Sequence, residues 1–155
     1  MFNFIKFDNL TDGEIQLLPL EYLQADVKKG FVPAYMFGIV SVTNKEKILG
    51  EIVLRVGDNE KTFYGGQIGY KVEEESRGRN YASKACLLVR EVAVSHDMKK
   101  LIISCNPNNI PSRRTCEKVG ASLKDIIDLP TTIYIKEAKD KQVFMDGRLG
   151  CFKFI

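Results

Sequence analysis

The sequence predicts a single-domain α/β or α+β fold, and three observations lead to that prediction. The chain has 155 residues, a length typical of one compact domain. Its first half alternates aromatic and β-branched runs with polar turns, as strands and their connections do. Its second half alternates helical periodicity with short apolar runs of strand type. We therefore expect residues 1–155 to form one domain in which a strand region precedes a β-α-β-α-β tail.

Strands dominate the predicted first half. Residues 14–18 have strand character, and residues 19–29 predict a short helix that ends at Gly30. Polar turns at 43–47 and 57–61 then separate three apolar segments. We expect these segments to be strands of an antiparallel meander, over residues 35–42, 48–56 and 63–72.

After residue 80 the hydrophobic pattern changes from the spacing of a strand to that of a helix. One helix face carries apolar or small residues at helical spacing: Ala82, Ala85, Cys86, Val89, Val92, Ala93 and His96. Residues 101–105 form the returning strand of a β-α-β crossover, and a second helix is expected from Asn109 to Gly120. Pro111 would lie in the first turn of that helix, where its missing N–H costs nothing. Residues 122–129 and 150–155 are candidate strands, and residues 130–149 receive no assignment.

Composition and charge exclude several classes of protein. The chain is 45% hydrophobic and 28% charged, close to the average of a globular domain. No apolar run approaches the ~20 residues of a membrane-spanning helix, and the first residues lack a secretory signal pattern. The net charge of +3 is too small to favour nucleic acid. We expect a cytoplasmic protein without a membrane or nucleic-acid partner.

The four cysteines and the single histidine do not predict a metal site. Cys86, Cys105, Cys116 and Cys151 contain no Cys-x-x-Cys pair. Three of them lie inside apolar patterns, as buried free thiols do. A helix C-terminus explains His96 adequately, since cations are favoured there.

The turn before the first predicted helix is the strongest candidate for a binding site. A helix N-terminus has unpaired N–H groups and the positive end of the helix dipole. Gly78 allows close approach, and Arg77 and Arg79 add positive charge. The turn is therefore either a pyrophosphate site or an ordinary strand-to-helix turn with solvated arginines. The glycine spacing matches neither a Walker loop nor a dinucleotide fingerprint.

Two motifs in this region resemble a known family. Residues 77–82 (Arg-Gly-Arg-Asn-Tyr-Ala) resemble the Arg/Gln-x-x-Gly-x-Gly/Ala signature of the GNAT superfamily of N-acetyltransferases. Residues 109–120 resemble that family's Asn-x-x-Ser-x-x-x-x-Glu-Lys-x-Gly helix, in the expected order and separation. The resemblance covers roughly residues 34–155. It implies a mixed central sheet of about six or seven strands flanked by helices.

The resemblance implies an acetyl-CoA site without a metal. The backbone of Tyr70, Lys71 and Val72 would contact the pantetheine. Asn109 and Ser112 would lie near its thiol end. The pyrophosphate would be held by the loop that comprises Arg77, Gly78, Arg79, Asn80, Tyr81 and Ala82. Asn80 replaces the usual second glycine, and asparagine tolerates left-handed backbone better than most residues.

The implied reaction is acetyl transfer to a primary amine of a small molecule or a protein N-terminus, by direct attack. An amine with a pKa of ~10.4 must lose a proton first, so a general base is expected. Gln67 stands where the family often has a carboxylate. Glu51 is the first substitute, with a solvated strand carboxylate as the other interpretation. Residues 73–75, all glutamates, are more typical of a surface.

The leaving thiolate needs a proton donor or hydrogen-bond donor. Ser112 and Cys116 lie on one helix face, and Cys116 stands where many family members have tyrosine. Packing against the sheet also explains Cys116, and Tyr134 is an outside candidate. Because neither a base at 67 nor a tyrosine at 116 is present, a non-catalytic CoA-binding regulatory module is the alternative. The acceptor stays open, and the fold is compatible with a homodimer through its last strands.

Overall fold

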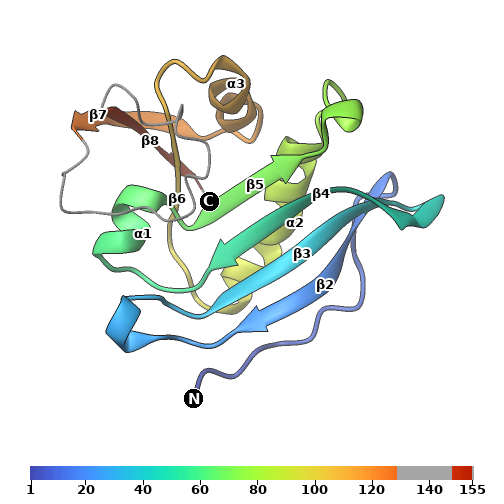
Figure 1. Ribbon diagram of the computed structural model, residues 1–155, viewed down its shortest axis with the longest axis horizontal. Helices are drawn as coiled ribbons and strands as arrows, with labels where there is room; N and C mark the ends of the chain where they lie inside the picture. Colours follow the sequence, from blue (N-terminus) through green and yellow to red (C-terminus); the bar gives the residue numbers. More distant parts are fainter. Residues whose placement is uncertain (129–147, 155) are drawn as a thin grey trace.

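The computed structural model describes residues 1–128 and 148–154, and its strands form two sheets (Figure 1). The first sheet is antiparallel and has the strand order β1-β2-β3-β4-β5. Its strands are β1 (Leu10–Thr11), β2 (Ile15–Leu23), β3 (Ala34–Ser41), β4 (Asn44–Arg55) and β5 (Ile68–Val72). The predicted antiparallel meander is thus confirmed as β3-β4-β5.

The predicted helix over residues 19–29 is wrong. The strand β2 continues to Leu23 and pairs with β3, with a register shift between Pro19 and Glu21. Only a short 3₁₀ helix, η1 (Val27–Lys29), follows it. The predicted end at Gly30 is confirmed, because Gly30 has a φ of 70° and caps η1 in the left-handed conformation.

Two further boundaries differ from the prediction. The strand β4 begins at Asn44, inside the predicted turn, because Val42 and Thr43 alone connect it to β3. Residues 60–65 form the helix α1 (Glu60–Gly65) rather than the start of β5. A capping box explains this helix, since the Asn59 side chain accepts from the Thr62 N–H and the Thr62 hydroxyl accepts from the Asn59 N–H.

The helix α2 (Tyr81–Ser95) covers one face of the first sheet and closes the core (Figure 1). Its buried side chains include Ala85, Cys86, Val89, Val92 and Ala93, which confirms the predicted apolar face. The facing strands supply alternate residues, as the strand period requires. Those that are almost wholly buried are Ile15, Leu17, Tyr35, Phe37, Ile39, Ile52, Leu54 and Ile68.

The second sheet is formed by the last strands and carries α3 (Ile110–Lys118) above it in Figure 1. Its order is β6-β8-β7, with β6 (Leu101–Cys105), β7 (Ser122–Asp128) and β8 (Arg148–Phe154) antiparallel to their neighbours. The α+β class is confirmed. The strands divide between two sheets because β6 pairs with β8, while β5 contacts β6 only at its start.

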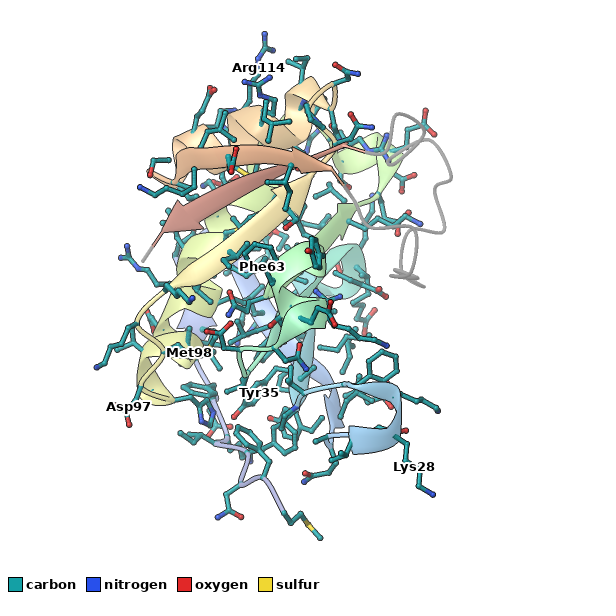
Figure 2. All side chains as sticks on the ribbon, turned by 90° about the vertical axis from the view of Figure 1, so that its left-hand side faces the viewer. Lys28, Tyr35, Phe63, Asp97, Met98 and Arg114 are labelled. Atoms are coloured by element: carbon teal, nitrogen blue, oxygen red, sulfur yellow. The ribbon has the colours of Figure 1, made fainter. Side chains whose placement is uncertain are left out.

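The end of α2 lies far from α3. Figure 2 shows Asp97, Met98 and Tyr35 toward one end of the molecule and Arg114, on α3, at the other. The Tyr35 hydroxyl accepts the Ile5 N–H at 2.8 Å and lies 2.6 Å from His96 Nε2. The Tyr35 hydroxyl therefore joins both the N-terminal segment and the end of α2 to β3, at a distance from the predicted cofactor loop.

Candidate active site

The strands β5 and β6 touch at their beginning and then diverge (Figure 1). Gln67 fixes this junction, because its N–H donates to the Ile102 carbonyl at 2.8 Å and its Oε1 accepts the Ile102 N–H at 2.7 Å. Its Nε2 also donates to the Gly57 carbonyl. With 1% exposure, Gln67 holds the two sheets together and does not face a substrate.

Gly66 allows the two strands to come this close. Its φ is 77°, and a Cβ there would lie 2.9 Å from the Ile102 carbonyl oxygen and 3.0 Å from the Ser104 nitrogen. Real Cβ atoms are not tolerated at such separations, so a larger residue would push β6 away. The point from which the strands diverge is thus set by Gly66 and Gln67 together.

A hydrogen bond joins β5 to α3 beside the diverging strands. The Tyr70 hydroxyl, from β5, lies 2.6 Å from Ser112 Oγ, on α3. Burial raises the pKa of the Tyr70 hydroxyl well above its usual range. The sequence prediction used only the backbone of Tyr70 and did not foresee that its side chain meets Ser112.

The start of α3 holds Ser112 in place. Asn109 is the N-cap, and its Oδ1 accepts the Ser112 N–H at 3.2 Å. Pro111 lies in the first turn, and Gly120 follows the helix with a φ of 81°, as predicted. Asn109 therefore has a structural role at this end of the helix, close to where it was expected to meet a cofactor.

The cysteines beside Ser112 are buried. Cys86, Cys105 and Cys116 are free thiols in the core, as predicted. Hydrogen bonds from Cys116 and Ser112 hold the pKa of the Cys105 thiol below its usual range, against the effect of burial. The bond to Cys105 and burial both raise the pKa of Cys116. Cys116 has no exposed surface, which favours Ser112 over Cys116 as the group that meets a ligand.

The predicted phosphate loop connects β5 to α2, and two of its residues have left-handed backbone. It begins with η2 (Glu74–Ser76), and the Arg77 Nε donates to the Val72 carbonyl at 3.1 Å. Gly78 has a φ of 81° with open space around it, and Asn80 has a φ of 63°. The expected left-handed Asn80 is confirmed. Asn80 makes no side-chain capping bond within the described residues, so the first amides of α2 can bind a ligand.

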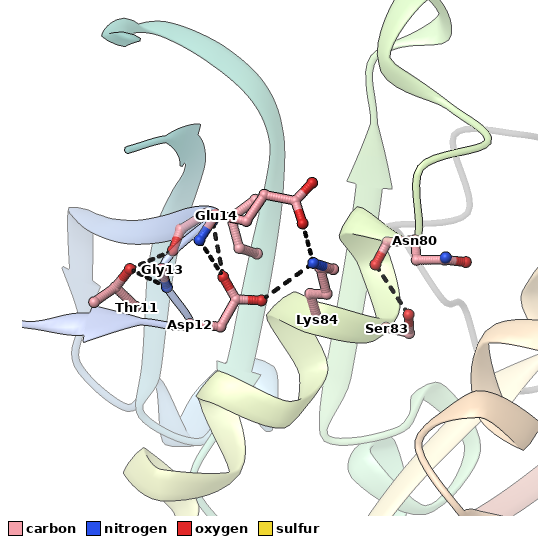
Figure 3. A network of polar contacts seen from close by, with 8 residues as sticks. Thr11, Asp12, Gly13, Glu14, Asn80, Ser83 and Lys84 are labelled. Atoms are coloured by element: carbon pink, nitrogen blue, oxygen red, sulfur yellow. Dashed lines mark hydrogen bonds and ion pairs between the residues drawn. The ribbon is translucent and has the colours of Figure 1, made fainter. Parts of the chain in front are cut away.

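Lysines from two elements lie beside this loop. Lys118, in the last turn of α3, donates to Asn80 Oδ1 and brings a positive charge to the start of α2. Lys84 is engaged elsewhere, since it pairs with Asp12 at 3.6 Å and with Glu14 (Figure 3). Lys118 belongs to the Glu-Lys-x-Gly motif, but its contact with Asn80 could not be predicted, because the two residues are 38 positions apart in the sequence.

Glu51 lies on the other face of the sheet from Tyr70. In the β4-β5 pair, Glu51 faces Lys71 while the neighbouring Ile52 faces Tyr70. Successive strand residues point to opposite faces of a sheet. Glu51 therefore lies on the face opposite to the Tyr70 side chain, which contacts Ser112. Glu51 is exposed, like residues 73–75. Tyr134 lies outside the described residues.

The described residues contain neither a candidate metal cluster nor a candidate membrane-spanning helix. No group of three or more His, Cys, Asp or Glu side chains could hold a metal ion. No helix in the described part of the chain is long and apolar enough to cross a membrane.

The family model of the acetyltransferase (GNAT) domain matches residues 11–122, more than half of the chain. The chain belongs to the GNAT acetyltransferase family. Acetyl-CoA is the cofactor of this family, so the expected cofactor is confirmed at the level of the family. No curated protein sequence matches the chain.

Solved GNAT structures share the fold. The microcin C7 self-immunity acetyltransferase, in complex with acetyl-CoA and AMP, is 19% identical with a TM-score of 0.56, over 79% of this chain and 61% of that one. A Bacillus anthracis GNAT acetyltransferase is 18% identical with a TM-score of 0.57, over 77% and 65%.

A third structure contains coenzyme A joined to a cysteine. It is a ribosomal L7/L12 alpha-N-protein acetyltransferase, 16% identical with a TM-score of 0.57, over 83% of this chain and 64% of that one. This GNAT chain thus spans less than two thirds of the length of each of the three structures.

Proposed function

We propose that this GNAT protein is an N-acetyltransferase that moves the acetyl group of acetyl-CoA to a primary amine. The acceptor would be a small molecule or a protein N-terminus, bound together with acetyl-CoA. The observation that carries the proposal is the loop at residues 77–82, where left-handed Gly78 and Asn80 leave the first amides of α2 available. The proposal includes action in the bacterial cytoplasm.

The residues around the diverging strands fit acetyl-CoA. The amides of the loop, with Arg79 and Lys118 beside them, suit a pyrophosphate. The edge of β5 toward β6 is unpaired beyond Gln67 among the described residues, so the backbone groups of the segment Tyr70, Lys71 and Val72 that point to this edge would bind the pantetheine amides. The Lys71 carbonyl points to Gly50 of β4 instead. Asn109 positions Ser112 at the thiol end.

Acetyl-CoA supplies a thioester, and the chain supplies orientation and proton handling. Glu51, exposed on the face opposite Ser112, would accept a proton from the acceptor ammonium through water. Ser112 would donate a hydrogen bond to the departing sulfur. This division of roles places the base and the donor on opposite sides of the reacting carbon, as direct attack requires.

A non-catalytic CoA-binding module is the second candidate. The observation that favours it is the burial of Gln67, whose side chain is fully engaged with Ile102 and Gly57. Position 67 therefore supplies no general base, and the catalytic proposal needs Glu51 in that role.

Calorimetric titration with acetyl-CoA, and with CoA as the comparison, tests the cofactor site. We expect micromolar binding, and Arg77→Ala or Gly78→Val should weaken it about tenfold. Arg90→Ala, on the exposed side of α2, is the matched control. Unchanged affinity in both loop variants would reject the placement of the site.

Thiol release across a panel of amines then separates the two candidates. Turnover with any amine establishes the transferase. Binding without turnover for every amine favours the regulatory module.

A further inference from the structure

Tyr70 makes a side-chain contact in the candidate site that has no part in the function proposed above. Its backbone belongs to β5, yet its hydroxyl lies 2.6 Å from Ser112 Oγ, on α3. The ring lies on the core side of the sheet, next to Ile52 of β4. The Tyr70 hydroxyl thus contacts Ser112 from the core side of the sheet, where β5 and β6 diverge.

The chemistry of the two hydroxyls decides which one donates. A phenol is a stronger hydrogen-bond donor and a weaker acceptor than an aliphatic alcohol, because its oxygen lone pair is delocalised into the ring. The hydrogen between the two oxygens, which lie 2.6 Å apart, is therefore that of Tyr70. Burial raises the pKa of Tyr70, so this phenol keeps its hydrogen at physiological pH. A serine hydroxyl has a single hydrogen and two lone pairs, so a Ser112 that accepts from Tyr70 keeps its own hydrogen for another acceptor.

We propose that Tyr70 is a positioning residue that keeps the Ser112 hydroxyl oriented as a hydrogen-bond donor toward sulfur. This sulfur is that of CoA during the reaction. This inference rests on the proposed function. When the C–S bond breaks, its electron pair stays on sulfur, and the proton that neutralises it comes from the amine through water. Ser112 and Tyr70 keep their own hydrogens.

The pH dependence of CoA binding tests this pair without turnover. A donor facing sulfur favours the thiolate and lowers the pKa of the bound CoA thiol. For a decrease of about one unit, the affinity of CoA should rise by up to about tenfold as the pH passes through the pKa of the bound thiol and then of the free CoA thiol. The affinity of acetyl-CoA, which has no ionisable thiol, corrects for other effects of pH.

Two variants and a control complete the measurement. Ser112→Ala should abolish the additional rise for CoA, and Tyr70→Phe should reduce it to about twofold or less. Tyr22→Phe removes the same atom from an exposed tyrosine of β2 and should leave the rise unchanged. In acetyl transfer, Tyr70→Phe should lower kcat about tenfold while the KM for acetyl-CoA stays within about twofold.

The outcomes are distinguishable. If the native protein does not bind acetyl-CoA, both this inference and the proposed function fail. If it binds acetyl-CoA but the CoA and acetyl-CoA affinities change in parallel with pH, only the role of the pair is rejected. Tighter CoA binding by Tyr70→Phe would show that the contact obstructs the site, and it also overturns the inference. Should Tyr70→Phe fail to fold, Ser112→Ala decides, since it keeps the ring.

Discussion

Among single residues, Gln67 is the one whose surroundings decide its role most clearly. Its amide joins β5 to β6 and to the Gly57 carbonyl while almost fully buried. A buried polar group in this position stabilises the fold only while every hydrogen bond is made. Glutamine stands here in place of the carboxylate that the family often has. Its amide nitrogen donates a hydrogen bond, which an ionised carboxylate cannot do.

Gln67→Glu should destabilise the protein without creating a base. One carboxylate oxygen can still accept the Ile102 N–H, but the other would face the Gly57 carbonyl with no hydrogen between them. We expect the free energy of unfolding to fall by about 2–4 kcal/mol, measured by chemical denaturation. Gln24→Glu, at an exposed position, should cost less than about 1 kcal/mol. A faster acetyl transfer by Gln67→Glu would contradict the structural role.

His96 should make stability depend on pH. Burial lowers its pKa below the usual ~6.5, against the opposing effect of Asp97. The unfolded chain then binds the proton more readily than the folded one. The stabilisation by neutral His96 is present above about pH 6.5 and is lost as the pH falls through the lowered pKa. Within residues 1–128 and 148–154, the His96 ring has the Tyr35 hydroxyl as its hydrogen-bond partner, 2.6 Å from Nε2.

The comparison of His96→Gln with the native protein tests this. Glutamine can still accept a hydrogen bond from Tyr35 but does not titrate. Chemical denaturation at about pH 7.5 and pH 5.5 should show a smaller loss of stability in the variant on acidification. Equal losses would assign the acid sensitivity to other groups.

At the scale of elements, the start of α2 and the end of α3 lie beside each other. Lys118 ends α3 and contacts Asn80, which begins α2. A phosphate at the first amides of α2, as proposed, would lie within reach of this ammonium group. Both helices would then contribute to the proposed anion site.

Lys118→Ala should weaken acetyl-CoA binding about fivefold, which corresponds to about 1 kcal/mol. The salt dependence of the affinity should also decrease, because one cation fewer faces the phosphates. Calorimetry at two salt concentrations measures both effects. Lys124→Ala, on the exposed part of β7, is the control and should change neither. An unchanged salt dependence in Lys118→Ala would place the phosphates elsewhere.

Elements with unbroken periodicity could be predicted, and those fixed by distant pairing could not. The face of α2 and the caps of α3 are local, and both were predicted within a residue or two. Leu20, Leu23 and Val27 recur at helical spacing, yet all three are exposed, and residues 19–23 belong to β2, which pairs with β3. Tertiary pairing thus overrides the local pattern in β2.

At the scale of the whole molecule, the candidate site lies between the two sheets. The loop at 77–82 and Ser112 could be predicted because each belongs to a local motif. The contacts of Tyr70 with Ser112 and of Lys118 with Asn80 could not, because both depend on where α3 lies relative to β5 and α2. These are the contacts that join the two halves of the site.

Acetyl-CoA should therefore stabilise both halves together. Binding at about 100 times the dissociation constant raises the free energy of unfolding by about 2.7 kcal/mol. For a chain of this size, that corresponds to an increase of about 5–10 °C in Tm. Because the ligand would contact β5 and α2 on one side and α3 on the other, amide exchange should slow in all three elements and in β6. Hydrogen exchange with and without acetyl-CoA measures this directly. Protection confined to α2 and its loop would show that the ligand binds one sheet only, and the proposed path between the strands would be wrong.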